Sequence, residues 1–223
     1  MAHASSRAIA GTKFVLIVAL FAPAFFAFHS LSDPSQTTAP PQRVKVVEAP
    51  RAPRPKDLVR IYSIVKSRCR DVTDAEIWQI AEVIQDESAK RKIDPLLVLA
   101  LIQVESGFRY GTVSPMGARG LMQIMPDTGR SLTRAVGHEY GVRPAAFTPE
   151  SLDDPLFNIR LGVYYLHDLQ KQFQNISLAL SAYHLGPVEI QNRLDNNVEY
   201  PFDFAALVLD AYRRYKTSAH PAF

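Results

Sequence analysis

Residues 94–105 read DPLLVLALIQVE, and this stretch decides the fold. From Pro95 to Val104 the only polar side chain is that of Gln103. Proline is well tolerated in the first turn of a helix, so a helix is expected to begin here. A helix that is apolar on every side must be buried nearly all around. The stretch therefore predicts the central helix of a domain.

Helical patterns lie on both sides of this stretch. Before it, Ile77, Ile80, Ala81 and Ile84 recur at the three- and four-residue spacing of one helix face, and residues 73–76 (TDAE) resemble a capping box. Ile61, Ile64 and Val65 show a similar spacing, which predicts a further helix before this one. After it, further helices are expected at residues 155–173, 176–184, 187–196 and 204–216.

A glycine-rich segment interrupts the helical pattern. Residues 107–120 contain four of the ten glycines and one proline, which predicts a loop with a possible short hairpin before helix resumes around Leu121. No segment shows sustained alternation of apolar and polar residues, and no internal repeat is found. The predicted fold class is all-α.

Composition limits the possible functions. The 223 residues, 47% of them hydrophobic, suffice for one domain with appendages. The net charge of +3 comes from the N-terminal part, because residues 61–223 carry 17 basic and 19 acidic side chains. A faintly acidic body argues against nucleic-acid binding. The single cysteine, Cys69, excludes an internal disulfide.

The first 31 residues have the pattern of an export segment. Residues 14–28 are uninterruptedly apolar and follow two basic side chains. Fifteen residues are few for a membrane span, which needs about 17–25. No small-x-small cleavage motif follows the run, so a cleaved signal peptide and a retained membrane anchor both stay open. No cysteine follows it directly, which disfavours a lipid anchor.

Residues 32–56 are expected to form a linker. They contain six prolines and most of the excess basic charge. Fully extended, the linker would reach roughly 75 Å at about 3.1 Å per residue. It is interpreted as a spacer between membrane and domain, with a processing remnant as the alternative, and its charges could rest on anionic lipids. The predicted domain then covers residues 57–216, followed by a short tail, 217–223.

Glu105 is a candidate general acid. It directly follows the apolar stretch and shares a helix face with Leu101 and Leu97. Burial and the negative end of the helix dipole would both raise its pKa, which suits a general acid near neutral pH. The alternative is a helix-end glutamate that points into solvent.

The sequence around Glu105 strongly resembles a known catalytic segment. Residues 97–108 (LVLALIQVESGF) and 114–126 (SPMGARGLMQIMP), followed by residues 154–155, 158–166 and 179–187, are similar in order and spacing to soluble-lytic-transglycosylase-type (SLT) domains. The resemblance covers about residues 90–190. It implies a lysozyme-like, multi-helix fold of the goose-lysozyme kind, with a central buried helix and a substrate groove.

The resemblance also implies roles for individual residues. Glu105 would be the single catalytic acid/base. Ser106 would orient the muramyl part of the substrate, while Met122 and Gln123 would lie in the groove, Gln123 offering both a donor and an acceptor. Tyr183 would reach the catalytic carboxyl with its hydroxyl group.

Each of these residues also has an ordinary structural explanation. Ser106 could satisfy the exposed helix end, Met122 could fill the core, Gln123 could be a solvated helix residue and Tyr183 a core aromatic. Residues 158–166 are interpreted mainly as scaffold packing.

One position departs from the family pattern. The family usually has Asn after the motif tyrosine, and here His184 stands there. Histidine can donate and accept hydrogen bonds but is larger, and as a residue type it titrates near neutral pH. His184 is expected to contact the substrate, in a way that differs from the family's asparagine. The spacing of His138, His167 and His184 matches no metal site, so no metal is expected.

The sequence offers no obvious second carboxylate for two-carboxylate hydrolysis. Asp94 lies about 16 Å along the helix from Glu105, and Asp127 follows a proline where helix capping is the more common use. The resemblance implies another route, in which the substrate's own N-acetyl and C6 hydroxyl groups act and a 1,6-anhydro product forms. No cofactor would take part.

The expected substrate is peptidoglycan, cleaved between N-acetylmuramic acid and N-acetylglucosamine. Two rivals stay open: a lysozyme-type hydrolase, and a catalytically inactive module for peptidoglycan binding or assembly. The export segment predicts a periplasmic or cell-envelope location, with anchoring in the inner membrane as the open alternative to a cleaved signal. Cell-envelope assembly partners are possible, and the sequence does not identify them.

Overall fold

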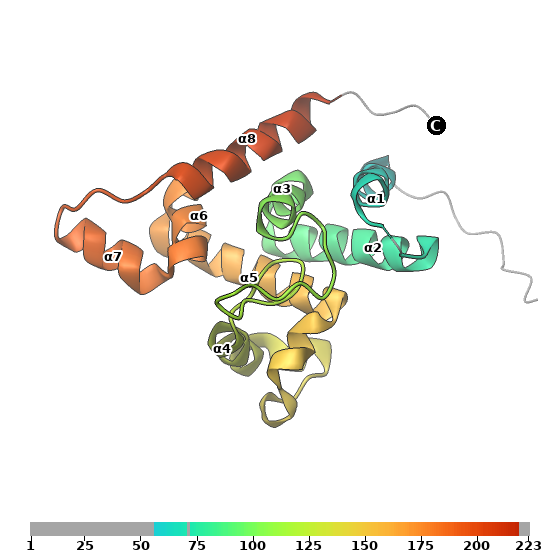
Figure 1. Cartoon of the computed structure of the whole chain (residues 1–223), viewed down its shortest axis with the longest axis horizontal. Coiled ribbons are helices and arrows are strands. Elements are labelled where there is room, and N and C mark those ends of the chain that lie inside the picture. The colour runs from blue at the N-terminus through green and yellow to red at the C-terminus, as the bar shows by residue number, and fades with distance from the viewer. Residues whose placement is uncertain (1–55, 71, 219–223) are drawn as a thin grey trace, which may run out of the picture. The chain divides into compact units, whose positions relative to one another are not determined.

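The computed structural model describes residues 56–70 and 72–218. The predicted signal or anchor, the linker up to residue 55 and residues 219–223 of the tail lie outside these ranges. The described part contains eight α-helices and three short 3₁₀ turns (Figure 1). The α-helices are α1 (Lys56–Arg68), α2 (Asp74–Arg91), α3 (Pro95–Glu105), α4 (Pro126–Val136), α5 (Pro155–Phe173), α6 (Ile176–Leu185), α7 (Pro187–Asp195) and α8 (Asp203–Thr217). The 3₁₀ turns are η1 (Gly137–Tyr140), η2 (Pro144–Ala146) and η3 (Pro149–Asp153).

The predicted all-α class is confirmed. The described residues form no β-strand, only two isolated antiparallel bridges, Val113 with Arg119 and Arg119 with Ile124, in the glycine-rich loop. None of the helices in the described ranges is long and apolar enough to cross a membrane.

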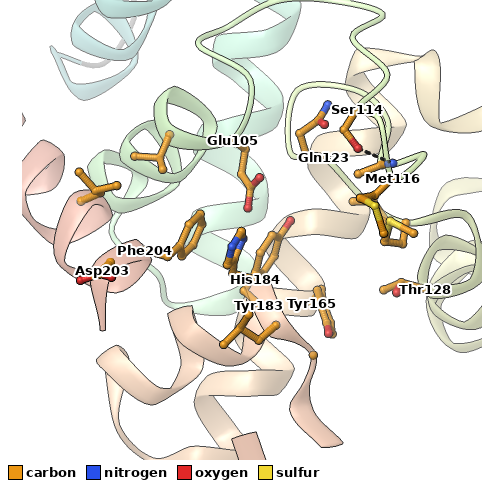
Figure 2. A pocket seen from close by; sticks show the side chains of 17 residues that line it. Glu105, Ser114, Met116, Gln123, Thr128, Tyr165, Tyr183, His184, Asp203 and Phe204 are labelled. Carbon is orange, nitrogen blue, oxygen red and sulfur yellow. Dashed lines mark hydrogen bonds between the residues drawn. The ribbon is translucent and has the colours of Figure 1, made fainter. Parts of the chain in front are cut away.

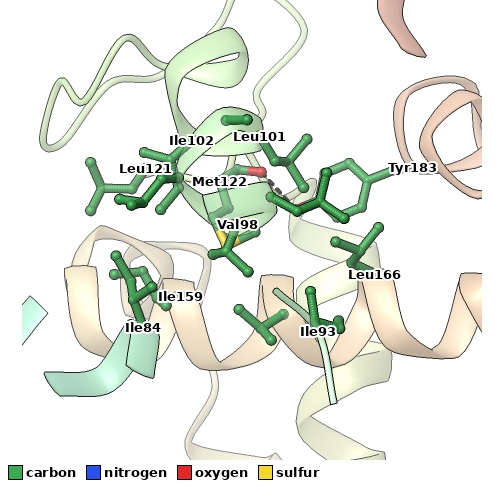
Figure 3. Close-up of a cluster of buried hydrophobic side chains, with 14 of the residues drawn as sticks. Ile84, Ile93, Val98, Leu101, Ile102, Leu121, Met122, Ile159, Leu166 and Tyr183 are labelled. Carbon is green, nitrogen blue, oxygen red and sulfur yellow. Dashed lines mark hydrogen bonds between the residues drawn. The ribbon is translucent and has the colours of Figure 1, made fainter. Parts of the chain in front are cut away.

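Helix α3 is the central helix, as its sequence predicts. Residues 98–102 are wholly inaccessible to solvent. Val98, Leu101 and Ile102 face Ile159 and Leu166 of α5 in a shared cluster (Figure 3). Helix α8 packs along α3, and α2 packs against both α1 and α5. This packing holds the last residue of α3 in a fixed position.

Local caps set where two of these helices begin. Thr73 and Glu76 form the predicted capping box at the start of α2, satisfying two backbone donors. Asp94 caps α3 by accepting a hydrogen bond from the amide of Leu96 at 2.9 Å, and it also accepts one from the Tyr212 hydroxyl on α8 at 2.7 Å. Asp94 therefore fastens α3 to α8 rather than taking part in a site near Glu105.

The predicted resumption of helix around Leu121 differs from the structure. Residues 120–123 form a turn, and α4 begins only at Pro126. Asn158 holds this turn: its amide donates to the carbonyls of Arg119 and Leu152, and its Oδ1 accepts from the amide of Met122 at 2.8 Å. The buried Asn158 thus makes the stretch 158–166 a support for the loop as well as helix packing.

Candidate active site

A cleft of about 800 Å³ opens at the carboxyl end of α3. Its walls come from five parts of the chain: the end of α3, the loop and helix start at residues 114–128, Tyr165 of α5, the end of α6 and the start of α8. Glu105 points into this cleft (Figure 2). The fold therefore brings together segments that are up to about a hundred positions apart.

Glu105 combines access to the cleft with poor hydration. Its side chain is half-buried, and burial raises its pKa from 4.5 to about 8. No side chain or amide of the described residues donates a hydrogen bond to its carboxyl group. The raised pKa was predicted from burial and the helix dipole together, and burial is the cause found here. Burial therefore favours the acid form of Glu105 at neutral pH, the form that can give a proton.

Asp203 is the other carboxylate among the described residues that line the cleft. In Figure 2 it lies beyond the ring of Phe204 as seen from Glu105. Asp127, considered above, is in the first turn of α4, is exposed and does not line the cleft. Among the described residues that line the cleft, no other carboxylate therefore faces Glu105 directly.

Neither Ser106, expected to orient the muramyl part of the substrate, nor Met122, expected in the groove, is among the residues that line the cleft. Ser106 is buried, and its hydroxyl donates to the carbonyl of Ile102 at 3.2 Å, the ordinary role of satisfying a helix end. Met122 is fully buried against Gly162, where a Cβ atom would lie 2.4 Å from the Met122 sulfur. Because Gly162 has no side chain, there is room for the Met122 side chain to pack in the core.

Gln123 does line the cleft, but it has fewer hydrogen-bonding groups available to a substrate than expected. Its backbone has a φ of 46°, in the left-handed region, which turns the side chain away from the preceding core residue. Its amide nitrogen donates to the carbonyls of Thr112 at 3.0 Å and Gly120 at 2.8 Å. Both of its donors are thereby used, so Gln123 offers a substrate only its carbonyl oxygen.

Tyr183 lines the cleft, but its hydroxyl group binds another partner than expected. It donates to the carbonyl oxygen of Met122 at 2.9 Å instead of reaching the carboxyl group of Glu105. Burial, with the nearby charge of Glu105 as a smaller cause, raises the pKa of Tyr183 well above its ordinary value. Tyr183 therefore stays neutral and holds the turn at Met122 in place.

His184 lines the cleft as expected. It stacks on Phe204, which the sequence did not indicate as a cleft residue. Its ring lies parallel to that of Phe204 in α8, with centroids 4.4 Å apart and planes at 6°. Tyr165 also lines the cleft and packs against Tyr183 at 5.1 Å. Tyr165 belongs to a stretch interpreted as scaffold, and Phe204 carried no signal beyond helix periodicity.

No cluster of three or more metal-ligating side chains occurs in residues 56–70 and 72–218. His138 and His167 do not line the cleft with His184. The polar side-chain groups that do line it are two carboxyls, an imidazole, hydroxyls and an amide, which suit hydrogen bonding to sugars.

An all-α domain with a cleft at the end of a buried helix is the fold of the lytic transglycosylases. The 70 kDa soluble lytic transglycosylase of Escherichia coli superposes with a TM-score of 0.51 at 28% identity, over 60% of this chain and 23% of that one. A complex of the 70 kDa soluble lytic transglycosylase with bulgecin A gives 0.52 at 26% identity, over 62% and 24%.

The sequence comparisons agree with the fold. The family model of the transglycosylase SLT domain matches residues 82–203, more than half of the chain. The chain therefore belongs to the transglycosylase SLT domain family.

Individual relatives match over a limited length. The chain is 37% identical over 105 residues to a transglycosylase of Enterobacteria phage PRD1, which covers 47% of this chain and 34% of that protein. It is 29% identical over 150 residues to membrane-bound lytic murein transglycosylase C of Mannheimia succiniciproducens, covering 63% and 41%. This chain thus spans less than half the length of each relative.

Proposed function

We propose that this protein is a peptidoglycan lytic transglycosylase. It cleaves the β-1,4 bond between N-acetylmuramic acid and N-acetylglucosamine without water and leaves a 1,6-anhydro-muramyl end. The observation that carries the proposal is the half-buried Glu105 pointing into an open cleft in which no other described carboxylate faces it, and burial raises its pKa to about 8. Membership of the SLT family and relatives named lytic murein transglycosylases support it.

In the proposed reaction Glu105 acts twice. Its carboxyl group gives a proton to the glycosidic oxygen as the bond to C1 of the muramyl residue breaks. The substrate's N-acetyl group stabilises the positive centre left at C1. The C6 hydroxyl oxygen then bonds to C1 while its proton returns to the Glu105 carboxylate. The enzyme ends as it began, and no cofactor takes part in these steps.

The lack of a second carboxylate facing Glu105 among the described cleft residues favours this route over hydrolysis. Hydrolytic glycosidases place a second carboxylate across the bond as a nucleophile or to activate water, with carboxyl groups roughly 5–9.5 Å apart. Here Asp203 lies behind Phe204 as seen from Glu105 (Figure 2). The nucleophile is therefore assigned to the substrate itself.

The proposed place of action is the cell envelope, because peptidoglycan lies outside the cytoplasmic membrane. The apolar run at residues 14–28 would export the chain or anchor it in the inner membrane, and the proline-rich linker would let the domain reach the wall. Fractionation that finds the protein in the cytoplasm would contradict this location.

Mass spectrometry of the fragments released from peptidoglycan tests the reaction. Wild-type protein is expected to release anhydro ends, one water lighter than reducing ends, and Glu105→Gln is expected to release none. Asp203→Asn is the control, because it removes the other cleft carboxylate and should keep the anhydro product. Reducing ends alone would identify a hydrolase. Glycan binding without release by the wild-type protein would identify a binding module.

A further inference from the structure

Every methionine of the described residues lies in the stretch 114–128, which forms one wall of the cleft. These are Met116, Met122 and Met125. Met116 and Met125 line the cleft and are 81% and 42% exposed, whereas Met122 is wholly buried. The reaction proposed above uses none of their sulfur atoms. Two accessible thioethers therefore stand in the cleft, close along the chain to one that solvent does not reach.

The backbone fixes Met116 at the tip of a tight turn. The amide of Gly117 donates to the carbonyl of Ser114 at 2.9 Å, and the amide of Ala118 donates to the Ser114 hydroxyl at 3.0 Å. Gly117 has a φ of 87°, in the left-handed region that glycine adopts readily. The turn therefore holds the Met116 side chain out at the edge of the cleft, across from Phe204 (Figure 2).

Apolar side chains from other elements complete the same surface. Leu185 at the end of α6 and Leu207 of α8 also line the cleft and are exposed. Exposed apolar side chains that gather at one cleft are typical of a binding surface. Methionine suits such a surface because its unbranched, polarisable side chain adapts to the shape of a ligand. We expect the C–H faces and N-acetyl methyl groups of a bound glycan to pack against Met116 and Met125.

Oxidation by a peroxide changes the polarity of a methionine side chain. A lone pair of the thioether sulfur attacks one oxygen of hydrogen peroxide, so that an S–O bond forms and the O–O bond breaks. The sulfur loses two electrons and the peroxide is reduced. The proton on the transferred oxygen passes to the departing hydroxide, which leaves as water. The product is methionine sulfoxide, a polar group in place of an apolar one.

We propose that Met116 and Met125 are sites of reversible oxidation by peroxide, and that their sulfoxides weaken the binding of glycan strands in the cleft. The proposal rests on the proposed function for the identity of the bound polymer. A sulfoxide oxygen is hydrated, and a glycan that packs its C–H face against this side chain must remove that water at a cost in free energy. Oxidation therefore raises KM, while Glu105 is unchanged and kcat is kept.

Peptide mapping of the full chain tests the sites. Trypsin gives one peptide, residues 110–119, that carries Met116, and another, residues 120–130, that carries Met122 and Met125. Fragment ions of the second peptide distinguish its two methionines. Hydrogen peroxide is expected to add one oxygen to Met116 and one to Met125 and to leave Met122 unchanged, because Met122 is buried. Oxidation of all three at the same rate, or of none, would overturn the assignment.

Kinetics on soluble glycan strands test the consequence. Oxidation of the wild-type protein is expected to raise KM about tenfold, the size of effect that lost apolar burial of two partly exposed side chains allows. The change in kcat should stay below about twofold, which separates weaker binding from damage to the acid/base group. The two methionine sulfoxide reductases, each of which reduces one sulfoxide epimer, should restore KM.

Met116→Leu with Met125→Leu is the matched variant. Leucine keeps an apolar side chain of similar volume and has no sulfur to oxidise. Whatever the KM of the untreated variant, peroxide should leave it unchanged. A rise in the variant equal to that in wild type would place the damage elsewhere, for example at Cys69, and would overturn the proposal. Sulfoxides at both positions with an unchanged wild-type KM would overturn it as well.

Failure of the proposed function gives a different result. Untreated wild-type protein would then release no anhydro product, whatever the state of its methionines. Co-sedimentation with insoluble peptidoglycan measures binding without turnover. Weaker binding after oxidation of the wild-type protein, but not of the double leucine variant, supports the proposal. Equal binding of wild-type protein before and after oxidation refutes it.

Discussion

The hydroxyl of Tyr183 donates a hydrogen bond to the carbonyl oxygen of Met122, joining residues 61 positions apart at 2.9 Å. Met122 is followed by Gln123 and Tyr183 by His184, and both of these following residues line the cleft. One buried hydrogen bond therefore connects two walls of the candidate active site.

Removing this hydrogen bond should loosen the cleft. Tyr183→Phe leaves the buried carbonyl of Met122 without its donor, which is expected to cost about 1–3 kcal/mol of unfolding free energy. Urea denaturation measures this loss. Tyr165→Phe is the control, since the hydroxyl of Tyr165 makes no hydrogen bond to a described residue. Equal stability of Tyr183→Phe and wild type would show that water replaces the lost donor.

The rate should depend on pH through Glu105. Because the pKa of Glu105 is raised to about 8, the acid form predominates below that pH, and the rate is expected to fall as pH rises through about 8. A rate profile between pH 5 and 10 checks this. A fall centred near pH 4.5 would mean that the carboxyl group has its ordinary affinity for protons.

The free energy of unfolding, like the rate, should fall as pH rises because of Glu105. Between pH 4.5 and about 8 the unfolded chain releases the Glu105 proton while the folded domain keeps it, so rising pH destabilises the fold across this window. Glu105→Gln removes the cost and should be more stable than wild type at pH 9. We expect a gain of roughly 1–3 kcal/mol, less than the full shift because the side chain is half exposed. No gain at pH 9 would contradict the burial of the charge.

The stack of His184 on Phe204 should contribute to glycan binding. Phe204→Ala removes the support for the imidazole ring, and loss of an aromatic pair worth about 0.5–1.5 kcal/mol should raise KM by about 2- to 10-fold. Leu207→Ala, on the same helix and also lining the cleft, separates loss of the stack from loss of apolar surface. If both variants raise KM equally, the stack has no special part in binding.

The space at Gly162 should be essential for the position of Met122. In Gly162→Ala the new Cβ atom would lie 2.4 Å from the sulfur and 2.9 Å from the Cβ of Met122. Overpacking of this kind typically costs about 1–3 kcal/mol. Thermal unfolding measures the loss, and a change below about 0.5 kcal/mol would show that the Met122 side chain simply moves aside.

Asp94 should make the fold sensitive to acid. Burial opposes its charge, but hydrogen bonds from Tyr212, the amide of Leu96 and Lys216 prevail and lower its pKa. Its contribution is thus present above pH 3.8 and is lost as pH falls through the lower folded value. Asp94→Asn keeps a capping side chain but loses the charge, so it should cost less than about 1 kcal/mol near neutral pH, and the difference from wild type should shrink as pH falls below 3.8. A difference independent of pH would point to packing alone.

Local patterns determined most of the helices. The predicted helix 155–173 matches α5, and the capping box at Thr73 opens α2 as expected. These features follow from the sequence because helix hydrogen bonds, caps and apolar periodicity involve residues only three or four positions apart. The identity of Glu105 as the residue at the end of the buried helix is a local feature of the same kind.

Tertiary packing alone decided which side chains meet. Met122 enters the core because Gly162, forty positions later, leaves room, and the Tyr183 hydroxyl meets a carbonyl rather than Glu105. Phe204 joins the cleft because α8 packs on α3 and α6. Such contacts join distant positions, and their distances depend on how whole helices pack rather than on the spacing of residues along the chain.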